Sequence, residues 1–360
     1  MAKLGEVCLL KAGKFVSSND ISPEYNKGLY PCFGGNGIRG YVADYTHDGE
    51  FPLIGRQGAL CGNVNLASGK FHATEHAVVV QPKIEMNVHW LYYALNAMNL
   101  GQYATGAAQP GLAVSKLETL SIEIPNISEQ NKIAQTLYKV EQLVNFRKQQ
   151  LEKLDELVKA RFVEMFGDIS NSRKVPMQDV CKIITDGTHQ SPKFVLSGIP
   201  FLFVSNIVTN EIHYDAEKFI SEETYNELIK RTPIEVGDVL LSTVGSYGHT
   251  AVVKENKPFC FQRHIAYLKP NNSVVNSEYL RCAILSTDLQ RQIDESVKGI
   301  AQKTLNLSEI RKLRLPLPSL SLQNQFAAFV ERVDQQKQTV QQSLEKLELM
   351  KKALMQEYFG

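Results

Sequence analysis

The stretch Pro125-Asn-Ile-Ser-Glu-Gln-Asn131 returns 193 positions later as Pro318-Ser-Leu-Ser-Leu-Gln-Asn324. At the same offset, residues 106–167 align with 299–360 without a gap, and Leu151-Glu-Lys-Leu154 falls on Leu344-Glu-Lys-Leu347. A gapless match of this length indicates an internal duplication whose period is a domain, not a solenoid repeat. The chain is therefore predicted to contain one architecture twice.

A long helix is predicted after each copy of this motif. Pro125 and Pro318 disfavour helix before them, and Ser128 and Ser321 stand where an N-cap hydroxyl is expected. Apolar residues then keep a heptad rhythm, which is typical of a coiled coil. We expect an antiparallel pair within the chain, with an interface made by Ile133, Leu137, Val140, Val144, Leu151, Leu154 and Val158 in the first helix and Phe326, Val330, Val333, Val340, Leu344, Leu347 and Leu354 in the second.

Two other arrangements of the helices are less favoured. Each helix could fold back on its own domain, but a helix of about 39 residues is roughly 58 Å long. A domain of about 120 residues spans only some 30–35 Å, so such a helix would project beyond it. Pairing between helices of two different chains stays open.

The segments that precede the helices have a mixed α/β character. Short β-branched runs predict strands at 76–80, 199–204, 238–241 and 265–268, and helical periodicity appears at 88–98 and 221–231. The fold class is therefore α+β, with two mixed α/β domains joined by two long antiparallel coiled-coil helices in a pseudo-two-fold internal repeat. We divide the chain into a first domain 1–127, a first helix 128–168, a second domain 169–320 and a second helix 321–360.

Composition indicates an ordinary globular protein. Thirty-nine Lys and Arg nearly balance 38 Asp and Glu, so a net charge of +1 does not by itself point to nucleic acid. The six cysteines form no Cys-x-x-Cys pair, which argues against a zinc site. No secretory leader opens the chain, and no window approaches the roughly 18 apolar residues of a membrane helix. We expect a cytoplasmic protein with free thiols and no membrane partner.

Catalytic motifs are not evident, and we predict no catalytic residue and no metal site. The stretch Gly34-Gly-Asn-Gly-Ile-Arg-Gly40 lacks the Gly-Lys-Ser/Thr ending of a phosphate-binding loop and reads as a turn. Cys260 and His264 fall in a predicted strand, where their spacing only places them on one face. His76 and His264 occupy equivalent places, which indicates shared packing more than a duplicated catalytic base.

Polar loops recur at matching places in the two halves, for example at 55–58, 186–192, 205–206 and 245–249. Arginine suits guanine, Asn and Gln suit adenine, and hydroxyls contact bases or phosphates. Loops of this composition are more often ordinary turns, but their recurrence in two diverged copies favours a role in contacting nucleic-acid bases. These loops and the repeat together define a recognisable pattern.

The chain resembles, over essentially its full length, the specificity subunit of a type I restriction–modification system. The second half carries Asp186-Gly-Thr-His-Gln-Ser-Pro192 and Gly237-Asp-Val-Leu-Leu-Ser242 followed by Gly245-Ser-Tyr-Gly248, and the first carries Leu53-Ile-Gly-Arg-Gln-Gly58 and Thr74-Glu-His-Ala77. The resemblance implies two target recognition domains that each read half of a bipartite site in double-stranded DNA. It also implies that the helices set the spacer and dock two methyltransferase subunits, which restriction–translocase subunits join. S-adenosylmethionine and ATP would bind those partners, and this chain would bind no cofactor.

The same reading selects candidate base-contacting residues on the loops. They are Arg39, Arg56, Gln57 and Gln109 in the first domain, and Thr188, His189, Ser205, Asn206, Tyr247, His249, Gln302 and Lys303 in the second. The two domains would contact DNA about one helical turn, roughly 34 Å, apart. The alternatives are a stand-alone sequence-specific DNA-binding repressor, or the recognition part of a fused restriction or methylation enzyme.

Overall fold

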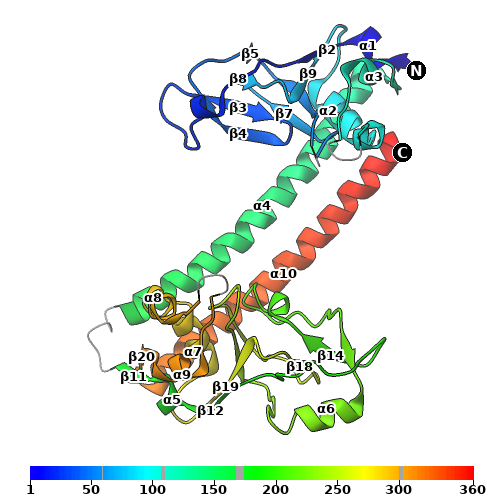
Figure 1. Cartoon of the computed structure of the whole chain (residues 1–360). Helices are drawn as coiled ribbons and strands as arrows, with labels where there is room; N and C mark the ends of the chain where they lie inside the picture. Colours follow the sequence, from blue (N-terminus) through cyan, green and yellow to red (C-terminus); the bar gives the residue numbers. More distant parts are fainter. Residues whose placement is uncertain (59, 107–109, 168–173, 300–302) are drawn as a thin grey trace. The chain divides into compact units, whose positions relative to one another are not determined.

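The structure is a computed structural model that describes residues 1–58, 60–106, 110–167, 174–299 and 303–360. The chain forms two compact units: unit 1 comprises Met1–Gln149 with Gln341–Gly360, and unit 2 comprises Gln150–Val340. Two long helices, α4 (Ile127–Phe166) and α10 (Leu320–Phe359), contribute residues to both units. Each unit therefore combines one globular segment with one part of each long helix (Figure 1).

Unit 1 is built on two four-stranded sheets and a short strand pair. The first sheet is antiparallel, in the order β2 (Cys8–Ala12), β9 (Ala77–Pro82), β6 (Phe51–Gly55), β7 (Val64–Ala67). The second has the order β4 (Gly37–Val42), β3 (Tyr30–Gly34), β8 (Lys70–Ala73), β5 (His47–Asp48), with β3 and β8 parallel. The remaining elements are β1 (Ala2–Lys3), β10 (Ser121–Ile122), α1 (Leu4–Val7), α2 (Val88–Ala97), α3 (Val114–Glu118) and the 3₁₀ turns η1 (Ser18–Asp20) and η2 (Leu100–Tyr103).

Unit 2 repeats the first sheet strand for strand. Its order is β12 (Cys181–Asp186), β19 (Ile265–Pro270), β16 (Val239–Ser242), β17 (Thr250–Val252), again antiparallel. The second sheet runs β13 (Phe194–Val195), β15 (Phe219–Ile220), β14 (Ile199–Leu202), β18 (Cys260–Phe261), with β14 and β18 parallel. The remaining elements are β11 (Lys174–Pro176), β20 (Arg314–Pro316), α5 (Met177–Val180), α6 (Glu222–Leu228), α7 (Ser277–Ile284), α8 (Thr287–Ser296), α9 (Leu307–Lys312) and η4 (Val204–Asn206).

The same polar anchor ties each globular segment to a long helix. In unit 1 the buried Gln130 accepts from the Asn87 N–H at 2.9 Å and donates to the Pro125 carbonyl at 2.9 Å. In unit 2 the buried Gln323 accepts from the Asn276 N–H at 2.8 Å and donates to the Pro318 carbonyl at 2.9 Å. Asn87 and Asn276 also cap α2 and α7, so each anchor fixes a helix N-terminus. The repeated Gln-Asn motif is therefore structural.

The predicted caps of the long helices are wrong by two residues. Both helices start one residue before the predicted serine, at Ile127 and Leu320. The Asn126 carboxamide oxygen accepts from the Glu129 N–H at 3.0 Å, and the Ser319 hydroxyl accepts from the Leu322 N–H at 3.4 Å. Each motif contains two candidate caps after its proline, and the earlier one is used.

The two long helices are antiparallel in each unit. Lys351 pairs with Glu141 at 2.6 Å in unit 1, and Lys337 pairs with Asp155 at 2.9 Å in unit 2. Leu151, Leu154 and Val158 of α4 cluster in unit 2 with Val333, Val340 and Phe329 of α10. The sequence reading did not include Phe329 in this set. The α+β fold with an internal repeat and a pair of long antiparallel helices is confirmed.

Other residues of the predicted stripes lie against the globular cores. Ile133 and Leu137 belong to the main core of unit 1, where Leu354 also packs, and Phe326 and Val330 belong to that of unit 2. Val140, Val144 and Leu344 are buried, and Leu347 is half-buried. The heptad stripe thus serves two purposes along its length, covering a domain core near both ends of each helix and pairing with the other helix in between.

The long helix of each repeat ends in the core of the unit that contains the globular segment of the other repeat. Phe166, near the end of α4, is buried in unit 2, with its ring 4.9 Å from that of Tyr279 on α7. Phe359, near the end of α10, lies in unit 1 with its ring 6.4 Å from that of Trp90 on α2. The repeated Phe-Gly ending of the two halves is therefore accounted for by packing.

Candidate nucleic-acid interface

Four segments of unit 1 are joined by backbone hydrogen bonds beyond one end of the β2-β9-β6-β7 sheet. The Gly13 N–H donates to the Ala77 carbonyl at 3.0 Å, and the Arg56 N–H donates to the His76 carbonyl at 3.0 Å. The Leu112 N–H donates to the Arg56 carbonyl at 2.9 Å. The loops after β2, β6 and β8 and the segment before α3 therefore form one surface, and we call its described part loop cluster 1 (residues 13–14, 56–58, 60–62, 74–76, 105–106 and 110–112).

Unit 2 contains the same set of backbone bonds. The Gly187 N–H donates to the Ile265 carbonyl at 3.1 Å, the Thr243 N–H to the His264 carbonyl at 2.9 Å, and the Leu305 N–H to the Thr243 carbonyl at 2.8 Å. We call the described part of this surface loop cluster 2 (residues 187–190, 243–249, 262–264, 298–299 and 303–305). Arg56 and Thr243 are thus structurally equivalent, and so are His76 and His264. The equivalence of the two histidines, predicted from sequence, is confirmed.

A glycine is required where the first sheet enters each loop cluster. A Cβ at Gly13 would lie 2.1 Å from the Ala73 carbonyl oxygen, and a Cβ at Gly187 would lie 2.1 Å from the Phe261 carbonyl oxygen. Both contacts are with backbone, which cannot move aside as a flexible side chain can. The glycine of the Asp186-Gly-Thr-His motif therefore lets two chain segments approach closely.

Loop cluster 1 holds two of the four candidates that the sequence selected in the first domain. Arg56 is half-buried, and Gln57 is exposed and forms a bridge with Gly111. Arg39 is exposed on β4, and its Cδ is 3.8 Å from the Cβ position of Gly34 in the adjoining hairpin. Gln109 lies outside the described residues.

The Asp186 motif of unit 2 forms a small charged network. His189 Nε2 lies 2.9 Å from Asp186 Oδ2, and Arg231 contacts the other oxygen of the same carboxylate. The Thr188 hydroxyl donates to the Gln190 carbonyl at 3.0 Å, which shapes the loop. The sequence reading selected Thr188 and His189 but missed Arg231, which is 45 residues from Asp186 and carries no motif signal.

The loop after β16 brings three further candidates together. The Tyr247 hydroxyl donates to Asp294 at 3.0 Å, and the Lys303 amine lies 6.0 Å from the centre of the Tyr247 ring. The His249 N–H donates to the Ser242 hydroxyl at 2.9 Å, which leaves the imidazole half-buried at the surface. Gln302 lies outside the described residues.

Ser205 and Asn206 lie apart from these loops, in the turn η4 after β14. Ser205 is exposed, whereas Asn206 is buried. The Asn206 carboxamide accepts from the Phe203 N–H at 2.9 Å and donates to the His213 carbonyl at 3.0 Å. Because both ends of the amide are used to hold the turn, the structure gives Asn206 a structural role and not that of an adenine-reading side chain.

Cys260 and His264 do not share a strand, so this prediction is wrong. Cys260 lies in β18 and His264 lies just before β19, and a turn between them is closed by the Ile265 N–H donating to the Gln262 carbonyl at 3.1 Å. Burial raises the pKa of the Cys260 thiol to about 12, which disfavours the thiolate that binds metals. Within the part of the chain that the structure describes, no three His, Cys, Asp or Glu side chains form a metal-binding group.

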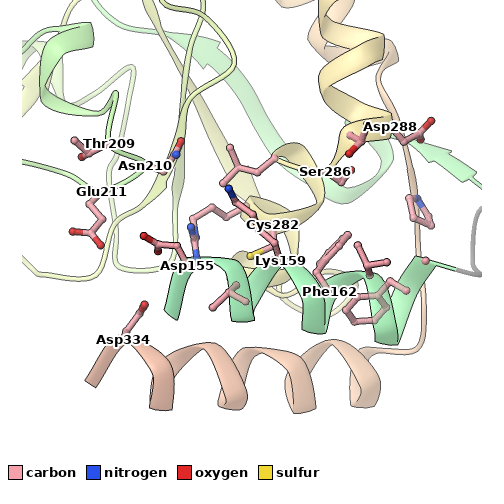
Figure 2. Close-up of a pocket in the computed structure, with 18 of the residues that line it drawn as sticks. Asp155, Lys159, Phe162, Thr209, Asn210, Glu211, Cys282, Ser286, Asp288 and Asp334 are labelled. Carbon is pink, nitrogen blue, oxygen red and sulfur yellow. The ribbon is translucent and has the colours of Figure 1, made fainter. Parts of the chain in front are cut away.

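A cavity of about 490 Å³ lies elsewhere in unit 2, between the long helices and α7 (Figure 2). Its wall on α4 includes Asp155, Lys159 and Phe162, and the opposite side includes Cys282 and Ser286. Burial raises the pKa of the Cys282 thiol to about 11, so it is protonated at neutral pH. The residues of loop cluster 2 do not line this cavity, which is therefore separate from the candidate interface.

Two copies of one sheet, each bearing unlike polar loops and joined to long helices, define a protein with two recognition units. The family model described as the type I restriction modification DNA specificity domain matches residues 1–156 and again residues 170–349. The chain therefore belongs to this family. None of the helices in the described ranges is long and apolar enough to span a membrane.

Individual relatives have corresponding descriptions. The type I restriction enzyme EcoprrI specificity subunit of Escherichia coli is 52% identical over 143 residues, which cover 39% of this chain and only 36% of that protein. A putative specificity subunit, S.HindORF215P of Haemophilus influenzae, is 25% identical over 333 residues, which cover 85% of this chain and 80% of that protein.

A solved structure shows the same fold. The crystal structure of a type I restriction–modification system S subunit from M. genitalium superposes with a TM-score of 0.66 at 18% identity, covering 99% of this chain and 95% of that chain. At this level of identity the likeness concerns the fold alone.

Proposed function

We propose that this chain is the non-catalytic DNA-specificity subunit of a type I restriction–modification complex, and that its globular segments, 1–127 and 169–320, each read half of a bipartite asymmetric site. The observation that carries the proposal is the repetition of one loop framework with different side chains. At equivalent backbone positions unit 1 has Arg56 and unit 2 has Thr243. Two readers of one shape with different surfaces suit two different DNA sequences.

The side chains on the clusters have the chemistry that base reading needs. Arg56, His189, Tyr247 and Lys303 are hydrogen-bond donors on loops, and arginine in particular makes two bonds to guanine. The charge of the segments is close to balanced, with 9 basic and 10 acidic residues in 1–127 and 18 basic and 16 acidic residues in 171–320. Phosphate contacts dominate affinity, so we propose that partner subunits supply most of the grip on the backbone.

The long helices are proposed to set the spacer and to dock two methyltransferase subunits, with restriction–translocase subunits joining them. In unit 1, Phe146 on α4 is 59% exposed and Leu349 on α10 is 69% exposed, which is unusual for large apolar side chains. These positions favour a protein partner along the pair. S-adenosylmethionine and ATP are proposed to bind those partners and not this chain.

Co-expression with a type I methyltransferase subunit from the same host, followed by methylome sequencing, tests the proposal. We expect adenine or cytosine methylation at one bipartite motif only when both proteins are present. Replacing residues 1–127 with the corresponding segment of another family member should change one half of the motif and leave the other intact. A change in both halves, or sequence-specific DNA binding without any capture of a methyltransferase, would contradict the proposal.

A further inference from the structure

Unpaired buried polar atoms are concentrated at one place in unit 1. Among the described residues, seven buried side-chain polar atoms have no hydrogen-bond partner, and four of them belong to Arg56, Thr74, Glu75 and His76. These atoms are the Arg56 Nε, the Thr74 hydroxyl, the Glu75 Oε2 and the His76 Nδ1. Buried polar groups are almost always paired, so a local group of exceptions calls for an explanation, and one is a ligand contact for which these side chains turn outward.

The residues with unpaired atoms belong to two loops that touch. The Arg56 N–H donates to the His76 carbonyl at 3.0 Å, and His76 Nε2 lies 3.2 Å from Glu75 Oε1. The tip of the β3–β4 hairpin closes over both, because the Cβ position of Gly35 is 3.3 Å from the His76 carbonyl oxygen. The backbone of Arg56 thus adjoins that of His76, and the His76 imidazole pairs with the Glu75 carboxylate within loop cluster 1.

The equivalent positions of unit 2 carry charged groups in a different arrangement. Thr243, the equivalent of Arg56, is 4% exposed and has no cationic group. Arg263, which directly precedes His264 as Glu75 precedes His76, is exposed, and its Nε lies 3.3 Å from His264 Nε2. The arginine therefore lies on the loop after β6 in unit 1 and on the loop before β19 in unit 2.

We infer that Arg56, Glu75 and His76 determine the half-site read by unit 1, and that Arg263 and His264 determine the half-site read by unit 2. This inference rests on the proposed function. A guanidinium pairs with the O6 and N7 of guanine, and a carboxylate accepts from the amino group of cytosine. The half-site of unit 1 then contains a guanine set by Arg56 and a cytosine set by Glu75. In the half-site of unit 2, Arg263 sets a guanine.

The experiment uses the full chain co-expressed with its methyltransferase and reads the methylated motif over a whole genome. Arg56→Ala and Glu75→Gln should each lower discrimination about ten-fold or more at one base pair of the first half-site and leave the second half-site unchanged. Arg263→Ala should relax only the second half-site. Lys27→Ala and Lys230→Ala, which remove one exposed positive charge from each unit, should change neither motif.

If Arg56→Ala abolishes methylation altogether, Arg56→Lys provides the test. It keeps the charge but replaces the rigid planar fork of donors with a flexible ammonium that matches guanine O6 and N7 less well, so the inference predicts that methylation persists with a relaxed first half-site. An Arg56→Lys protein that keeps the wild-type discrimination would overturn the inference while the proposed function stands. If the wild-type pair methylates no motif, the proposed function itself fails, and the two results are distinguished by the wild-type control.

Discussion

Unit 1 and unit 2 share a sheet and a helix anchor but carry different chemistry on the same loops. The strand order of the first sheet is identical, and Gln130 and Gln323 make the same bonds to a helix N-terminus and to a proline carbonyl. At equivalent positions of the loop clusters, unit 1 has Arg56 where unit 2 has Thr243. Likewise, unit 1 has Glu75 where unit 2 has Arg263. The two units agree in these backbone contacts and differ in the side chains that the same loops carry.

The second sheets show how far the divergence reaches into the fold. In unit 1 the β3–β4 hairpin presses its tip on strand β6, because a Cβ at Gly55 would lie 2.0 Å from the Gly35 carbonyl oxygen. In unit 2 the equivalent of Gly55 is Ser242, a buried residue whose hydroxyl accepts from the His249 N–H. Gly55 and Ser242 are equivalent positions. A serine in unit 1 would overlap the hairpin, and a glycine in unit 2 would lack the hydroxyl that accepts from His249.

The largest effect is expected from exchanging these two residues. Gly55→Ser should cost about 3 kcal/mol or more in unit 1, because its Cβ would overlap backbone that cannot withdraw. Ser242→Gly should cost only about 1–2 kcal/mol in unit 2, since it removes one hydrogen-bond acceptor and adds backbone freedom. Hydrogen exchange of the amides in β6 and β9, compared with those in β16 and β19, measures each unit separately. Equal losses in the two units would break the comparison.

The sequence predicted the features that depend on local periodicity. The predicted helices at 128–168 and 321–360 lie within two residues of α4 and α10, because a heptad stripe repeats over many turns. Strand pairing could not be predicted, since β2 and β9 pair although residues 13–76 lie between them, and no local pattern identifies the partner. The caps were misplaced because Asn126 and Ser128 are both good capping residues and only tertiary packing chooses between them.

The candidate interface stays a prediction, and the sequence could select its loops but not the contacts between them. Turn-forming and polar residues selected the loops after β6 and β16, but the network of Asp186 with His189 and Arg231 joins residues far apart in sequence. Glu75 and Arg263 were visible only as neighbours of equivalent histidines. Glu75 stood out through a buried oxygen without a partner, and Arg263 through its equivalent place before His264, and neither property can be read from a local sequence pattern.

A smaller, symmetric effect is expected at the two anchors. Gln130→Met and Gln323→Met keep the side-chain volume but leave a buried N–H and a proline carbonyl unpaired, so each should cost about 2 kcal/mol. The losses should be close, with that of Gln323→Met slightly the larger, because both glutamines are buried and share two bonds while Gln323 also donates to the Val274 carbonyl at 3.2 Å. Gln149→Met, on the exposed surface of α4, is the control and should change stability by less than about 0.5 kcal/mol. A clear difference between the two anchors would show that one unit does not depend on its anchor.

The smallest effect is expected at the ion pairs that join the long helices. Lys351 pairs with Glu141 in unit 1, and Lys337 pairs with Asp155 and Glu211 in unit 2. Lys351→Met and Lys337→Met should each cost about 0.5–1 kcal/mol at low salt, because the pairs are partly exposed. The more exposed pair of Lys148 with Glu348 provides the control, and Lys148→Met should have a smaller effect than either.

The Lys337 pair should also respond to pH in a defined direction. Burial opposes the charge on Lys337, but Asp155 and Glu211 outweigh it and raise the pKa of the amine above its ordinary 10.5. Its contribution is therefore fully present at neutral pH and is lost only as the pH rises through the raised value. Chemical unfolding at several salt concentrations and at pH 7 and above 10 measures both effects. A Lys337→Met cost that is the same in 1 M salt as at low salt would assign the loss to packing of the lysine stem and not to its charge.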